Sequence, residues 1–366
     1  MSHVYRSEIV PIVGGSSKTV PLQFLRSTGP RGGRLEIVRI FIKLLVTATT
    51  DGSTSITAAG QCGWLNRIIV KDAKGDLWNL TGMEARAKHI YENGRFAIPD
   101  STALAVSSTM TNRAVKWCLD TAPRRCKRRW DYATPADSLT LIELTAAAAG
   151  GVGTGSGLSA ITQNYQVFVE CREVLKSTES KSRREVKGQT QAGTVDLKAG
   201  IFGGTLRSAF IYKAADHITG GTDVSGTANV TIDGLQLNQQ PVDVLQNQLQ
   251  QENDGDPAST TDPFMQATQR AIPLWWPSRD GKVPDQSFFD GELLVRLDAN
   301  SVSNVSIVTD LIVPRDDRST MAEEAIAKAA GHTGVTVKTY AKTRRNPKDW
   351  GRYANVMPIK AIGGED

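Results

Sequence analysis

A long run of alternating apolar residues is the feature that most limits how this chain can fold. Over residues 38–46 every second residue is Val, Ile or Leu, whereas the residues between them are mixed. Side chains on a strand point alternately to opposite faces, so this period of two predicts a strand with one buried face. The same period recurs over residues 165–169 and 293–297. A further strand is expected over residues 305–313, ending before Pro314.

Frequent glycine turns separate these strands. The chain has 366 residues and 33 glycines, and pairs such as Asp51-Gly52 and Asp233-Gly234 are typical of tight turns. Short strands, many turns and few long helices predict β-sandwiches or β-barrels. At roughly 100–200 residues per domain, the length favours two domains.

Two short helices are expected to interrupt the strands. Thr81 and Glu84 have the spacing of a capping box, in which the two side chains satisfy each other's backbone amides. That helix should end near Asn93, before Gly94. A second capping box at residues 320–323 opens an Ala-rich helix, and a weaker helical pattern follows Pro241.

The order of elements is repeated along the chain. Residues 68–94 and 229–255 each read as strand, Asp-containing turn, strand and helix, and they align without a gap, Asp72 with Asp233 and Gly94 with Gly255. A long strand precedes each copy. The preferred architecture is therefore two copies of one β-rich domain in tandem.

Motifs of catalysis and ligand binding are missing. The sequence has no P-loop, no G-x-G-x-x-G and no G-x-S-x-G. The histidines are isolated, and we interpret each as a surface or core residue: His3, His89, His217 and His332. The cysteines form no C-x-x-C pair, which favours free thiols and cytoplasmic assembly: Cys62, Cys118, Cys126 and Cys171. We expect no enzymatic activity, no cofactor and no metal. The chain also has no apolar run of about 18 residues for a membrane helix, and no signal-peptide pattern at its start.

Positive charge is concentrated in clusters, although the net charge is only +5. One cluster consists of Arg124, Arg125, Lys127, Arg128 and Arg129. A second, at residues 181–187, is smaller. The C-terminal cluster consists of Lys338, Lys342, Arg344, Arg345, Lys348 and Arg352, with Trp350 among them. Such clusters can neutralise phosphates or anionic lipid heads. The alternatives are a solvated face or ion pairs between subunits.

Trp275 and Trp276 lie between Pro273 and Pro277. Adjacent aromatic residues of this kind can anchor a protein interface. Core packing in the second domain is the competing interpretation, and stacking on a sugar is a third.

These patterns divide the chain into five segments. We expect an N-terminal arm (1–16), a first β-domain (17–178), a polar linker (179–188), a second β-domain (189–316), and a C-terminal helix with a basic tail (317–366).

A strand-rich chain of two similar halves, each with a helix after an early hairpin, resembles the double jelly-roll major capsid proteins of tailless, membrane-containing icosahedral phages and of adenovirus hexon. The resemblance covers about residues 17–316 and depends on the order of elements. It implies an all-β fold of two tandem antiparallel eight-stranded jelly rolls. It also implies pseudo-hexagonal homotrimers that build an icosahedral virion shell.

The partners implied by this resemblance are neighbouring capsid trimers, penton and minor capsid proteins, and an internal lipid membrane or the viral genome, with assembly in the host cytoplasm. Two other classes stay open. One is a viral receptor-binding or tail-associated β-protein whose tryptophans bind host-surface glycan. The other is a β-sandwich hydrolase or lyase with a concealed site. The repeat favours the capsid protein, and the missing catalytic motifs disfavour the enzyme.

Overall fold

The computed structural model describes residues 2–73, 75–93, 98, 101–121, 134–152 and 157–174 of the first half. In the second half it describes the backbone of the strands and Val244: residues 182–191, 195–201, 205–213, 227–232, 235–241, 271–275, 291–298 and 305–313.

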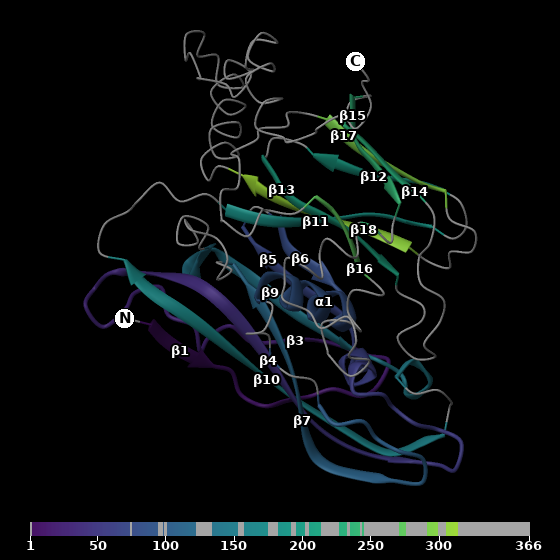
Figure 1. Ribbon diagram of the computed structural model, residues 1–366. Coiled ribbons are helices and arrows are strands. Elements are labelled where there is room, and N and C mark those ends of the chain that lie inside the picture. Colours follow the sequence, from purple (N-terminus) through teal and green to yellow (C-terminus); the bar gives the residue numbers. More distant parts are fainter. Residues whose placement is uncertain are drawn as a thin grey trace, which may run out of the picture.

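The first half consists of two antiparallel sheets (Figure 1). In the order of pairing, one sheet contains β1 (Ser2–Arg6), β10 (Leu158–Val174), β4 (Arg34–Thr50) and β7 (Thr109–Asp120); β2 (Val10–Pro11) also pairs with β10, and β8 (Thr134–Pro135) with β4. The other contains β3 (Ser17–Thr19), β9 (Leu139–Ala146), β5 (Leu65–Asp72) and β6 (Gly75–Leu80). We call the first of these the β1 sheet and the second the β3 sheet.

The second half repeats this arrangement. One sheet has the order β11 (Ser182–Gln191), β18 (Val305–Val313), β13 (Thr205–Lys213) and β16 (Ala271–Trp275). The other has β12 (Val195–Ile201), β17 (Gly291–Asp298), β14 (Thr227–Ile232) and β15 (Leu235–Pro241). Apart from the short β2 and β8, both halves place their first, eighth, third and sixth strands in one sheet and their second, seventh, fourth and fifth in the other. The chain therefore contains two tandem eight-stranded jelly rolls, as predicted.

The alternating pattern of the sequence marks the buried face of the first barrel. On β4, Ile40, Ile42 and Leu44 are fully buried, whereas the residues between them are half-buried. Tyr165 and Val167 are likewise fully buried on β10, which pairs with β4 along most of its length. Strand twist and pairing thus place both apolar stripes in one core.

Large aromatic side chains fill the middle of this core. They are Trp64, Trp78, Trp117 and Tyr165. The indole N–H of Trp117 donates to the carbonyl of Cys62 at 3.3 Å, and that of Trp64 donates to Gln61 Oε1 at 3.1 Å. Buried Trp needs such partners because an unpaired N–H in a core is costly.

The predicted helix after the β5–β6 hairpin is α1 (Gly82–Asn93), and it leads to β7. Its capping box is confirmed: the Thr81 backbone N–H donates to Glu84 Oε2 at 2.8 Å, and the Glu84 N–H donates to Thr81 Oγ1 at 3.1 Å. The described residues of the first barrel also contain the short 3₁₀ helices η1 (Ala59–Trp64), η4 (Ala136–Ser138) and η5 (Ala149–Gly151). The helix expected after Thr320 lies outside the described residues, and of the helix expected after Pro241 the structure describes Val244 alone, which is helical.

The β5–β6 hairpin and the β14–β15 hairpin occupy equivalent positions in the two barrels. This agrees with the repeat found in the sequence, although of the second copy of the helix only Val244 is described. In the described part of the Gly-rich stretch at 146–157, Ala147 is 5% exposed and Val152 only 1%. Both belong to the apolar core, which anchors this stretch.

Residues 2–11, within the segment expected to be an arm, pair with β10 and extend the β1 sheet. The other segment boundaries stay predictions.

The two barrels meet where β11 lies beside β6 (Figure 1). Among the described residues, no helix is long and apolar enough to span a bilayer.

Candidate functional site

The residues proposed from the sequence fall mostly where the structure gives no description. The basic clusters at Arg124–Arg129 and Lys338–Arg352 lie outside the described residues, within 122–133 and 314–366, whereas residues 182–187 of the smaller cluster lie on β11. Trp275 is the last residue of β16, where it pairs with Ala209 of β13. Trp276 follows outside the described residues. The roles proposed for all of them stay predictions.

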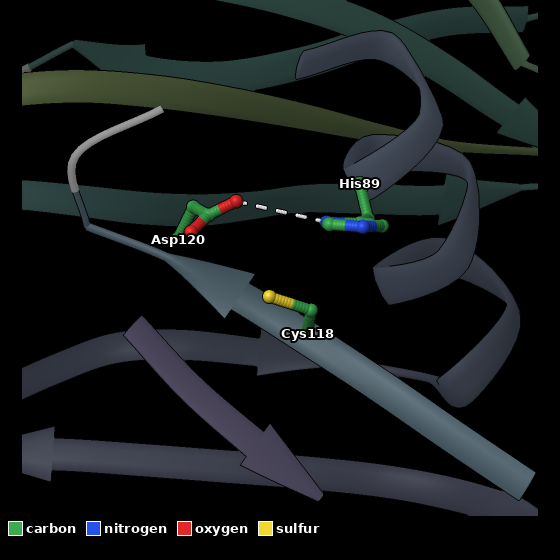
Figure 2. A group of neighbouring side chains, drawn as sticks. All are labelled: His89, Cys118 and Asp120. Atoms are coloured by element: carbon green, nitrogen blue, oxygen red, sulfur yellow. Dashed lines mark ion pairs between the residues drawn. The ribbon is translucent and has the colours of Figure 1, made fainter. Parts of the chain in front are cut away.

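A polar cluster that the sequence did not predict lies where α1 packs on β7. Helix α1 contributes His89 and Asn93, and β7 contributes Cys118 and Asp120. Figure 2 shows His89 pointing from the helix towards Asp120 and Cys118 on the strand. All four residues are buried, with exposed fractions of 8% or less.

The carboxylate of Asp120 is the centre of this cluster. Arg39 of β4, its direct cross-strand partner, donates from Nε to Oδ1 at 2.7 Å. Asn93 donates to Oδ2 at 2.9 Å, and His89 Nδ1 lies 3.6 Å from the same oxygen. Asn93 also donates to the carbonyl of His89 at 3.1 Å. Both carboxylate oxygens are therefore occupied by donors, as a buried charge requires.

His89, Cys118 and Asp120 could in principle hold a metal ion, since their ligand atoms lie within 4.8 Å of one another. The hydrogen bonds argue against this. Both ring nitrogens of His89 already have partners: the Ile98 N–H donates to Nε2 at 3.1 Å, and Asn93 Nδ2 lies 3.0 Å from Nδ1. Asn93 also donates to the carboxylate of Asp120, so protein donors already occupy the atoms that a metal would use. Arg39 further competes for the carboxylate.

The charges of the cluster suit a structural role. Burial alone would raise the pKa of Asp120, but hydrogen bonding from His89 and the charge of Arg39 hold that pKa below its usual range. The thiol of Cys118 is 3% exposed, so a substrate has no access to it. The cluster fastens the C-terminal end of α1 to the edge of the β1 sheet.

A second polar contact holds the N-terminal strand. Glu173, near the end of β10, accepts the backbone N–H groups of Arg31 and Gly33 at 2.8 and 2.9 Å. Its other oxygen lies 3.4 Å from Nε2 of His3 on β1. These backbone hydrogen bonds, with a smaller contribution from His3, lower the pKa of Glu173 despite its desolvation. One carboxylate thus joins β1, the 29–33 turn and β10.

Exposed apolar side chains are concentrated at the N-terminus. Of the large hydrophobic residues that are exposed in the described part of the chain, three lie within ten residues: Val4, Ile9 and Val13. The other two, Val106 and Val244, lie far away in sequence. Single exposed apolar residues are normal, but a group along one edge is typical of an interaction surface.

Comparison with known proteins gives a consistent result for the fold. No family model matches the sequence, and no curated protein matches it. Among solved structures, the major capsid protein of STIV is similar over 86% of this chain and 97% of its own length, with a TM-score of 0.56 and 14% identity. A structure of Sulfolobus Turreted Icosahedral Virus matches over 90% and 95%, with a TM-score of 0.58 and 13% identity. The PBCV-1 capsid matches over 86% and 94%, with a TM-score of 0.53 and 10% identity.

At these identities the likeness concerns the fold. The chain has the double jelly-roll fold of viral major capsid proteins, which confirms the resemblance drawn from the order of its elements.

The sequence did contain one sign of the buried cluster. His89 and Asn93 are four residues apart in the predicted helix and so share a face. No sequence pattern connects them to Arg39 and Asp120, which are 81 residues apart and meet only through the pairing of β4 with β7.

Proposed function

We propose that this chain is a major capsid protein that assembles as homotrimers into an icosahedral virion shell. The observation that carries the proposal is the identical strand order of its two barrels, together with a likeness to capsid proteins that extends over most of the chain. Fold alone does not define function. However, repetition of one barrel within one chain has a direct geometric use in a shell.

Three copies of a two-barrel chain supply six similar barrels around a threefold axis. Such a trimer has a nearly hexagonal outline, and hexagonal tiles can cover a closed surface when pentameric units fill the vertices. Neighbouring trimers, penton proteins and minor capsid proteins are the partners that this arrangement needs. The role is structural and requires no catalytic centre or cofactor.

The C-terminal tail is the proposed contact with the interior of the particle. Residues 338–352 contain six basic residues and one acidic residue, with Tyr340 and Trp350 among them. Basic side chains attract lipid or nucleic-acid phosphates, and aromatic side chains favour a lipid–water boundary. The cluster at Arg124–Arg129 offers the same chemistry. Assembly of these particles in the host cytoplasm fits Cys62, Cys118 and Cys171, which form no disulfide bond with one another.

The decisive experiment measures the mass of the purified protein and then its assemblies. Native mass spectrometry should give three chains per particle at micromolar concentration, and electron microscopy should show pseudo-hexagonal trimers or closed shells. Trimer interfaces should bury more than about 2,000 Å², as permanent assemblies do. A stable monomer that forms no larger particle would contradict the proposal.

A further inference from the structure

The outer edge of strand β1 has no strand partner in the part of the chain that the structure describes. β1 pairs with β10 along one edge, from Ser2 opposite Arg172 to Arg6 opposite Phe168. No described strand pairs with its other edge. After Ser7, whose side chain accepts the N–H of Val167, β2 continues along the same strand β10. Residues 2–11 therefore form one border of the β1 sheet.

This border carries solvent-exposed apolar side chains. Val4 is 63% exposed and Ile9 58%, and Val13, two residues beyond the border, is 79% exposed. From Val4, opposite Glu170, to Pro11, opposite Asn164, the border runs six residues along β10, or about 20 Å at 3.3 Å per residue.

Folded proteins usually protect such a border. An unpaired strand edge offers its N–H and C=O groups to any other strand, and Pro, Lys or a covering element normally prevents this. β1 has neither Pro nor Lys, and its central residue is the exposed Val4. Pro11 and the irregularity at Ser7 protect only the β2 part. The five residues of β1 are thus available for strand addition.

We propose that the open edge of β1 pairs antiparallel with β1 of a second copy of this chain, across a twofold axis centred on Val4. The β1 sheets of two subunits then form one continuous sheet, with the two β1 strands between the two β10 strands. This inference rests on the proposed function, because a shell is what brings many copies of this edge together.

The edge is complementary to itself. Antiparallel pairing centred on Val4 sets Arg6 opposite Ser2 of the other copy, and Tyr5 opposite His3. No two like charges face each other, and the two Val4 side chains cover each other. Contacts about a twofold axis must be self-complementary in this way. A threefold axis joins different surfaces, so the β1 contact lies between trimers rather than within one.

A disulfide tests this geometry directly. Directly opposite residues of antiparallel strands have Cβ atoms about 4.5–5.5 Å apart, which is within reach of a crosslink after small adjustment. Val4→Cys should therefore form a covalent dimer under mild oxidation, and peptide mass spectrometry should locate the bond between the two position-4 peptides. Val106→Cys, at a residue that is 47% exposed and distant in sequence, is the matched control and should give no such dimer. Absence of the position-4 crosslink in assembled protein would overturn the inference.

A second variant separates this inference from the proposed function. Val4→Asp should leave the trimer mass and thermal midpoint unchanged but lower the association constant between trimers at least tenfold. Val106→Asp should assemble like the unmodified chain. Normal shells from Val4→Asp would refute the edge contact and leave the capsid role intact. If the unmodified chain forms neither trimers nor shells, the capsid role fails. Sedimentation then tests the edge contact by itself. A dimer that Val4→Asp abolishes would support the contact, and a strict monomer would refute it.

Discussion

Arg39 of β4 and Asp120 of β7 lie directly opposite each other, and Arg39 Nε is 2.7 Å from Asp120 Oδ1. The Asp120 side chain is 1% exposed and that of Arg39 is 16% exposed. Through Asp120 this ion pair also reaches Asn93 and His89 of α1. The pair therefore connects two strands of the β1 sheet with the helix beside them. Its removal should weaken the packing of β4, β7 and α1 on one another.

Replacing Asp120 by Ala should lower the free energy of unfolding of the first barrel by about 3 kcal/mol. Removing one partner of a buried ion pair leaves an uncompensated charge, which typically costs 3–5 kcal/mol; Glu170, 3.5 Å from Arg39, limits the loss here. Asp137→Ala is the control, because Arg34 and Asp137 are 42% and 48% exposed and should contribute less than about 1 kcal/mol. Urea denaturation followed by tryptophan fluorescence measures both. Equal losses of unfolding free energy in the two variants would contradict the role of Asp120 as the buried partner of Arg39.

The same carboxylate predicts a pH dependence. The pKa of Asp120 is lower in the folded protein than its ordinary 3.8. Its contribution is therefore complete above about pH 5 and is lost as the pH falls through the lower folded value. The stability difference between the unmodified chain and Asp120→Asn should be constant at neutral pH and should shrink below pH 3.8. Denaturation midpoints across this range test it, and a difference that grows on acidification would show the sign to be wrong.

Gly82→Ala should disrupt the start of α1. A Cβ at position 82 would lie 2.7 Å from Trp117 Nε1 and 2.9 Å from the Leu65 carbonyl oxygen, and it would also meet the Cys62 carbonyl. Two of these neighbours are backbone atoms that cannot rotate away, so we expect a loss of about 3 kcal/mol. Gly150→Ala is the control, since nothing lies within 4 Å of a Cβ there. Similar thermal midpoints for the two variants would refute the close approach.

Tyr165→Phe should cost about 1–2 kcal/mol. The hydroxyl of Tyr165 lies 2.7 Å from Gln163 Oε1 and 3.0 Å from the Trp64 carbonyl, inside the core. Without it the buried Gln163 side chain loses this partner, and unsatisfied buried groups carry such a cost. Tyr5→Phe, on the partly exposed strand β1, should change stability by less than about 0.5 kcal/mol. A neutral Tyr165→Phe would mean that the core hydrogen bond contributes nothing.

Truncation after Gly331 tests the tail. It removes the six basic residues from Lys338 to Arg352, each worth about 1 kcal/mol near an anionic membrane. Trimers should still form, but particles should lose lipid or nucleic acid, as measured by phosphate content and electron microscopy. Truncation after Tyr353 keeps those six residues and serves as the control. Normal, filled shells from the shorter chain would exclude an anchoring role.

Much of the first barrel was predictable because its signals are local. The alternation over residues 38–46 follows from the pleat of a strand, and those same positions line the core. The capping box at Thr81 and Glu84 needs only residues within one helical turn, and both of its hydrogen bonds are present. The repeat of strand and turn predicted two similar domains because each copy carries its own pattern.

Pairing across the sheets decided the rest. A period of two tells which face of a strand is buried, but it does not tell which strand lies alongside, because any apolar face can cover another. Arg39 and Asp120 became partners only when β4 paired with β7. Residues 2–11 carry little alternation of their own, and they form part of the first sheet because β10 offers them an open edge. Sequence by itself determined the strands and the start of the helix, through backbone geometry within a few residues. Only the tertiary structure decided the neighbours, through contacts between residues far apart in the chain.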